Sequence, residues 1–77
     1  MIEHYFGKLG VAAVRLRSRL VVGDLIEIGS GEEHVRQRVE SMQIERKDVT
    51  EAFEGDDVGI KVKWPVASGS MVYRVDQ

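Results

Sequence analysis

The sequence contains no cysteine and no apolar run long enough to cross a membrane. Without cysteine there is neither a disulfide framework nor a thiolate metal site, and His4 and His34 show no metal-ligand spacing. A membrane helix would need about 18 consecutive apolar residues. The N-terminal stretch carries an acid and a histidine where a signal peptide has a positive start and an apolar run. We therefore expect a cytoplasmic protein with no membrane partner and no bound metal.

The sequence also lacks the residue patterns of an enzyme. No GxxxxGK[ST] phosphate loop is present, because Gly7-Lys8 is followed by leucine and has no upstream glycine. The serines have no histidine at a recognisable spacing, and Asp56-Asp57 is better explained as a turn cap than as an acid–base pair. We expect a non-enzymatic protein with no nucleotide or other cofactor.

Size and charge limit the remaining possibilities. A chain of 77 residues is one domain or a piece of one, and it buries only roughly 60–65% of the surface that it would expose unfolded. Its hydrophobic content of 43% and charged content of 31% are typical of a soluble folded domain. The net charge of −2 means that any binding to nucleic acid must come from a local basic patch. Residues 1–77 are therefore expected to form a single domain with a thin core.

Short alternating runs between turn residues indicate strands. Such runs cover roughly Leu9–Leu16, Leu25–Ile28, Asp57–Lys63 and the last segment around Met71–Val75. In the first of these Ala12, Val14 and Leu16 share one face, and in the third Val58, Ile60 and Val62 do. Reversals are expected at the glycine-containing stretches, which are Gly23-Asp24, residues 29–33 and Gly55-Asp56.

The longest run, residues 34–44, changes phase along its length. Val35 and Val39 are in one phase of the alternation, whereas Met42 and Ile44 are in the other. One strand cannot bury both pairs on the same side without a register slip, so we predict a β-bulge near Glu40–Ser41. A helix over Arg36–Ile44 is the competing interpretation. The whole pattern predicts an all-β fold, a small closed antiparallel β-barrel of about six strands.

Three segments resemble a known family. They are LVVGDLIEIG (residues 20–29), VESMQIERKDVTEAFEGDDVGIKV (39–62) and SGSMVYRV (68–75), and their order and spacing are similar to those in the second domain of translational GTPases such as elongation factor Tu. The resemblance implies a translation-protein β-barrel that binds transfer RNA or ribosomal RNA. By the same resemblance, Gln43, Arg46, Lys47 and Asp57 align with the family's pocket for the aminoacylated end of transfer RNA. Asp57 replaces an asparagine there, and a carboxylate repels phosphate.

Basic residues spaced by two provide a second candidate RNA surface. They are Arg15, Arg17 and Arg19, the pair Arg36 and Arg38, and the pair Lys61 and Lys63. On a regular strand each set shares one face, which could follow a phosphate backbone. The alternative interpretation is that these side chains are solvated and paired with Glu27, Glu40 or Glu51.

Two function classes follow. The first is a binding module for RNA or the ribosome in translation. The alternative is a protein-interaction or regulatory barrel without RNA binding, or a barrel detached from a peptidase-like or RNA-modifying enzyme, since such enzymes resemble this barrel at their C-termini. Self-association through an unpaired strand edge or the Trp64 face is a third possibility.

Overall fold

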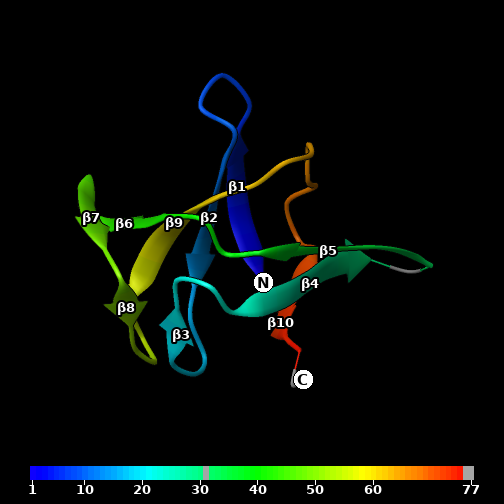
Figure 1. The fold of residues 1–77 in the computed structure, drawn as a ribbon. Helices are drawn as coiled ribbons and strands as arrows, with labels where there is room; N and C mark the ends of the chain where they lie inside the picture. The colour runs from blue at the N-terminus through cyan, green and yellow to red at the C-terminus, as the bar shows by residue number, and fades with distance from the viewer. Residues whose placement is uncertain (31, 76–77) are drawn as a thin grey trace.

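The computed structural model describes residues 1–30 and 32–75, which form ten strands and no helix (Figure 1). Every pair of neighbouring strands is antiparallel, so the predicted all-β class is confirmed and a helix over Arg36–Ile44 is excluded. No helix in these residues has the length and apolar character to span a membrane. The strands are β1 (Ile2–Phe6), β2 (Val11–Arg15), β3 (Leu20–Val21), β4 (Leu25–Ser30), β5 (Glu33–Arg38), β6 (Met42–Ile44), β7 (Lys47–Val49), β8 (Glu51–Ala52), β9 (Asp57–Lys61) and β10 (Met71–Arg74).

The strands form three sheets that meet around one core. The largest has the order β1-β2-β9-β6-β7, the second β10-β4-β5, and the third β3-β8. Backbone hydrogen bonds outside the strands join them, such as those from Ile2 N to Ser70 O and from Gly69 N to Ile2 O, both 2.8 Å. Among the described residues no sheet closes on itself, so the closed barrel is not confirmed.

The core is filled by the faces that alternation predicted. The buried side chains of this face are Ala12 and Val14 on β2 and Leu16 just beyond it. They lie beside the buried Val58 and Ile60 of β9, through the cross-strand pairs Val14–Val58 and Ala12–Ile60. Val62 is buried too, while Lys61 and Lys63 are exposed. The predicted inward and outward faces of these two segments are confirmed.

The predicted β-bulge near Glu40–Ser41 is wrong. Strand β5 ends at Arg38 and β6 begins at Met42, and the two strands belong to different sheets. Residues 39–41 cross between these sheets, with Val39 held by Gly23 and Asp24 through hydrogen bonds of 2.8 and 2.9 Å. Val39 and Met42 are each only 1% exposed. The change of phase in the sequence is therefore real. A crossover between sheets buries the apolar residues on both sides of the change, as a bulge would, so alternation alone cannot distinguish a crossover from a bulge.

The predicted reversal at Gly55-Asp56 is confirmed. Gly55 has a φ of 90°, in the region that favours glycine, and a carboxylate oxygen of Asp56 accepts a 2.8 Å hydrogen bond from Phe53 N. Gly59, inside β9, has a different role. A Cβ at this position would lie 3.0 Å from Cγ1 of Val11, so glycine leaves room for the Val11 side chain of the neighbouring strand.

Gln37 is a buried polar residue that joins two sheets. Its side chain lies on the inward side of β5 and is 4% exposed. The amide nitrogen donates to Lys61 O at 3.0 Å, and the amide oxygen accepts from Lys63 N at 2.9 Å. One side chain therefore satisfies two backbone groups at the end of β9 and connects the three-stranded sheet to the five-stranded one.

We expect Gln37→Ala to lower the free energy of unfolding by about 2–4 kcal/mol, because it leaves a backbone donor and an acceptor without partners. Urea denaturation measures the change. Gln43→Ala is the matched control: Gln43 is exposed and its amide bonds only to Asp48 among the described residues. It should change stability by less than about 0.5 kcal/mol. Equal losses in the two variants would show that Gln37 does not join the sheets.

The turn between β6 and β7 stores backbone strain. Ile44 pairs with Lys47, so Glu45 and Arg46 form a two-residue turn, with φ values of 51° and 67°. Two positive φ values match the hairpin turn that favours Asn-Gly, and neither glutamate nor arginine adopts them readily.

Replacing this turn by Asn-Gly, with Glu45→Asn and Arg46→Gly together, should raise the free energy of unfolding by about 1–2 kcal/mol. The gain comes from the removal of left-handed strain and is measured by urea denaturation. An unchanged or lower stability would mean that the two side chains make compensating contacts.

Candidate functional site: an arginine-lined groove

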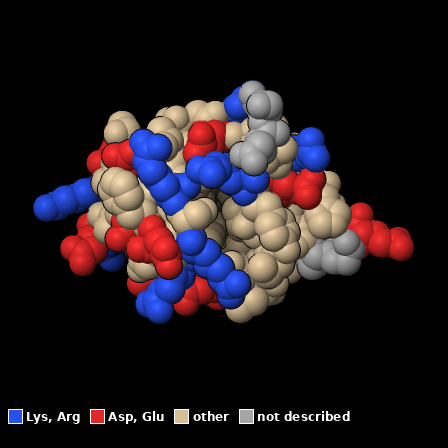
Figure 2. Space-filling model, turned by 90° about the horizontal axis from the view of Figure 1, so that it is seen from below, with Lys and Arg blue, Asp and Glu red and all other residues tan. Residues whose placement is uncertain are grey.

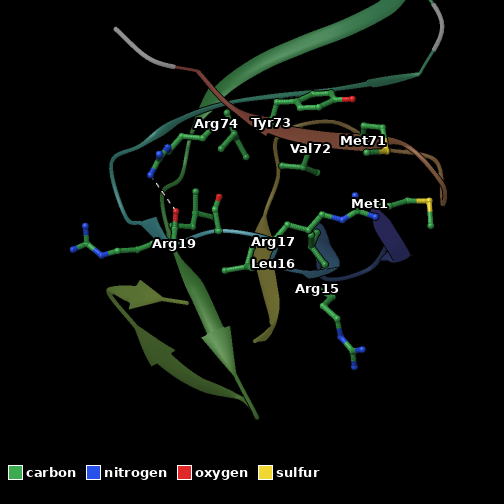
Figure 3. Close-up of a pocket in the computed structure, with 13 residues that line it drawn as sticks. Met1, Arg15, Leu16, Arg17, Arg19, Met71, Val72, Tyr73 and Arg74 are labelled. Carbon is green, nitrogen blue, oxygen red and sulfur yellow. Dashed lines mark hydrogen bonds between the residues drawn. The ribbon is translucent and has the colours of Figure 1, made fainter. Parts of the chain in front are cut away.

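A groove of about 220 Å³ lies where the chain from β2 to β3 passes beside β10 (Figure 3). Its floor consists of core residues, among them Val14, Leu16 and Ile26, and its apolar walls include Met71 and Val72. Four arginines line it, namely Arg15, Arg17, Arg19 and Arg74. Figure 2, which views this end of the molecule from below, shows Lys and Arg side chains gathered around a hollow with Asp and Glu side chains among them. The groove therefore combines an apolar floor with a cationic rim.

The end of the regular alternation in β2 creates this arrangement. Strand β2 stops at Arg15, and Leu16 is held by Asp56 and Gly55 through backbone hydrogen bonds of 2.9 and 2.8 Å. The Leu16 side chain is thereby buried, while Arg17 is exposed. Arg17 and Arg19 lie beyond the strand, so they do not share a strand face with Arg15 as a regular strand would require. The three arginines nevertheless line the same groove.

Two of the four guanidinium groups are neutralised by carboxylates. Arg15 donates from Nε and Nη2 to the two oxygens of Asp57, at 3.1 and 3.3 Å. Arg19 forms an ion pair with Glu51. In Figure 3 both side chains point away from the centre of the groove. Their positive charges are therefore held at its edges by partners on β8 and β9.

The other two guanidinium groups have no carboxylate partner among the described residues. Arg74 donates from Nη1 to the backbone oxygen of Arg19 at 3.2 Å, which orients the group without neutralising its charge (Figure 3). Arg17 makes no hydrogen bond or ion pair with any residue in the described part of the chain. In Figure 3 its side chain runs toward Met1. The groove therefore offers two available cations to an anionic ligand.

The groove continues past Arg17 into a second hollow. This hollow has a volume of about 380 Å³ and shares Met1, Arg15, Leu16 and Arg17 with the first. Its remaining lining residues are Glu3, Glu54 and Gly55. Arg17 thus lies between a basic hollow and one that is bordered by acids.

The residues predicted to bind RNA are distributed over several surfaces and are mostly paired within the protein. Arg36 bonds to Glu27 at 2.9 Å, and Lys63 lies 3.5 Å from Glu40. These two pairs and Arg19–Glu51 agree with the alternative interpretation for three of the seven spaced cations, which pair with Glu27, Glu40 and Glu51.

The other predicted residues form no single site either. Arg38 donates to Gly23 O at 3.2 Å, Lys61 to Leu9 O at 2.7 Å, and Gln43 to Asp48 at 3.0 Å. Gln43 and Lys61 line one hollow together with Gly59. Arg46 and Lys47 lie in and beside the β6–β7 turn, and Asp57 is held by Arg15.

Arg74 is the functional candidate that the sequence analysis missed. It is 55 residues from Arg19 in the chain, and no local spacing connects them.

Among the described residues, no group of three or more His, Asp or Glu side chains is placed so that it could hold a metal ion.

Comparison with known proteins identifies peptidase relatives. No protein-family profile matches the chain. An uncharacterized protease of Methanocaldococcus jannaschii is 37% identical over 73 residues, which are 94% of this chain and 18% of the relative, so the chain spans about a fifth of that protein's length. The solved C-terminal domain of a candidate U32 peptidase from Geobacillus thermoleovorans is 26% identical with a TM-score of 0.89, covering 97% of this chain and 88% of that domain. The selenomethionine variant of that domain is also 26% identical, with a TM-score of 0.87, and the match covers 95% of this chain and 93% of the variant.

These matches correct the resemblance to the second domain of elongation factor Tu. The relatives are a protease and the C-terminal domain of a U32 peptidase, not a translation factor, so the assignment to translation is wrong. The segments that suggested it consist largely of turn glycines and aspartates followed by β-branched strands. Short antiparallel strands require such residues in any family, because the positive φ of a tight turn favours glycine. The findings instead fit the alternative, a domain of the kind attached to a peptidase.

The hydrogen bonds from Arg15 hold the pKa of the Asp57 carboxyl below its ordinary value, and the same pairing raises the pKa of the Arg15 guanidinium. A carboxyl with a lowered folded-state pKa contributes stability above its unfolded pKa, about 3.9. This contribution is lost as the pH falls from that value through the folded-state pKa.

Asp57→Asn should therefore flatten the decline of the thermal midpoint below about pH 4 and change the midpoint only slightly at neutral pH, since the pair is exposed. Thermal unfolding followed by circular dichroism across this range measures the slope. Arg15→Gln removes the donor instead and should flatten the same interval. A slope unchanged in both variants would contradict the linkage.

Proposed function

We propose that the chain is a non-catalytic polypeptide-binding domain that works with a catalytic unit of the U32 peptidase type. The observation that carries the proposal is the match to a peptidase's C-terminal domain over 97% of this chain, with a TM-score of 0.89. The chain also corresponds to only 18% of the M. jannaschii protease, which leaves most of that protein for other functions. A domain of this kind contributes substrate binding while the reaction takes place elsewhere.

The chemistry of the groove supports a binding role. Two of its lining residues carry a hydroxyl, Ser18 and Tyr73. The charged side chains that line the groove with these hydroxyls are arginines, which stay protonated and cannot act as a general base. Apolar and cationic surfaces, by contrast, suit the capture of a polypeptide. The cytoplasmic location expected from the sequence is part of this proposal.

The test compares three forms of the M. jannaschii protease: intact, lacking its matching 73-residue region, and carrying this chain in that place. Capture of immobilised casein by biolayer interferometry is the readout, so the result does not require turnover. We expect the deletion to weaken casein binding about tenfold and the graft to restore it to within about threefold of the intact form.

Incubation of this chain alone with casein provides the control for catalysis. No fragments should appear on a denaturing gel. A graft that binds casein no better than the deletion, or fragments produced by the isolated chain, would overturn the proposed function.

A further inference from the structure

We propose that the arginine-lined groove binds an acidic peptide segment, in which glutamate or aspartate side chains pair separately with Arg17 and with Arg74 and a neighbouring apolar side chain rests on the groove floor. This inference depends on the proposed function for its polypeptide ligand, and it adds the chemical class of the segment that is recognised.

The cations argue for a carboxylate. Arg17 has no partner among the described residues, and Arg74 is oriented by a backbone oxygen that leaves its charge unneutralised. Guanidinium groups match the planar carboxylate and can donate two parallel hydrogen bonds to it. Because Asp57 and Glu51 already hold Arg15 and Arg19, an incoming carboxylate would not have to displace an internal partner.

The floor argues for an apolar neighbour of that carboxylate. Leu16 is 7% exposed, and the half-buried Met71 and Val72 form the adjoining wall. Methionine adapts its unbranched side chain to different apolar shapes. A volume of about 220 Å³ is smaller than that of typical small-molecule sites, so it suits one or two side chains rather than a folded ligand.

The open end argues for a segment within a chain rather than a chain terminus. The groove continues beyond Arg17 into the hollow of about 380 Å³, which Glu3 and Glu54 border. A peptide backbone can therefore enter at one end and leave at the other. The two glutamates disfavour further acidic residues there, which makes the recognised segment one with spaced rather than continuous acids.

The same charges disfavour a nucleic acid. Four carboxylates lie around the arginines, on Asp57, Glu51, Glu3 and Glu54. A polyanion gains affinity from many phosphate contacts along a continuous basic surface, and single strands also stack on aromatic rings. The groove has interrupted positive charge and a single aromatic lining residue, Tyr73.

Fluorescence anisotropy of the full chain with blocked ten-residue peptides tests the proposal. One peptide alternates leucine and glutamate, and its neutral counterpart alternates leucine and glutamine. A labelled twelve-nucleotide oligouridine is the nucleic-acid probe. We expect the acidic peptide to bind at least tenfold more tightly than the neutral peptide and than the oligouridine, with an affinity that falls as salt rises.

Variants locate the binding. The double substitution Arg17→Ala and Arg74→Ala should weaken the acidic peptide at least tenfold and leave the neutral peptide unchanged. Arg36→Ala is the matched control, because it removes an exposed arginine of β5, outside the groove, and should not alter either affinity. Circular dichroism and thermal unfolding verify that each variant is folded. If Arg17→Ala/Arg74→Ala does not fold, Arg17→Ala alone is used, with an expected loss of at least threefold.

The outcomes separate the two proposals. Equal binding of the acidic and neutral peptides, no effect of the arginine substitutions, or tighter binding of oligouridine overturns the acidic-segment proposal. Casein capture by the grafted protease would still support the proposed function in that case. Conversely, if the graft fails to restore casein capture while acidic peptides bind through Arg17 and Arg74, the proposed function fails and the groove's chemistry holds.

Discussion

The structure depends on holding three small sheets around one thin core. The two-stranded sheet is too small to be stable alone, and the apolar faces of the five-stranded and three-stranded sheets are buried in one shared core. Their margins are therefore joined by backbone hydrogen bonds and, between β5 and the end of β9, by the buried amide of Gln37. Inside this frame Ile2, Ile26, Val39, Met42 and Ile60 are almost fully buried. These hydrogen bonds between the sheets hold the apolar faces together in one core.

This construction also explains the position of the groove. Where β2 ends, Leu16 is still held inward by the Gly55-Asp56 turn, but the chain no longer follows the sheet. The arginines after it are thereby left at the edge of the core beside β10. Arg15 and Arg19 pair with carboxylates on β9 and β8. Arg17 and Arg74 have no carboxylate partner among the described residues. A cationic groove with an apolar floor is the result of joining sheets at this end of the molecule.

The comparisons and the geometry of the groove support the same proposal. The chain is similar to the C-terminal domain of a candidate U32 peptidase over nearly its whole length. Its candidate site is a groove with an apolar floor and arginines at its edge, and the described residues contain no group of His, Asp or Glu side chains that could hold a metal ion. The resemblance to a translation factor came from turn and strand residues, which report on how short strands are connected. Such residues carry little information on the ligand, because the ligand contacts side chains that the turns do not specify.

The sequence by itself determined the all-β class, the inward faces of β2 and β9 and the Gly55 reversal, because alternation and positive φ are local requirements. It also offered Glu27, Glu40 and Glu51 as partners of the spaced cations without assigning them, and of the three observed pairs Arg36–Glu27 lies across neighbouring strands. Only the tertiary structure decided that residues 39–41 cross between sheets, that Gln37 is buried as a joint, and that Arg74 meets Arg19 across 55 residues of chain. These features depend on which strands become neighbours in space, and no local pattern of residues encodes that choice.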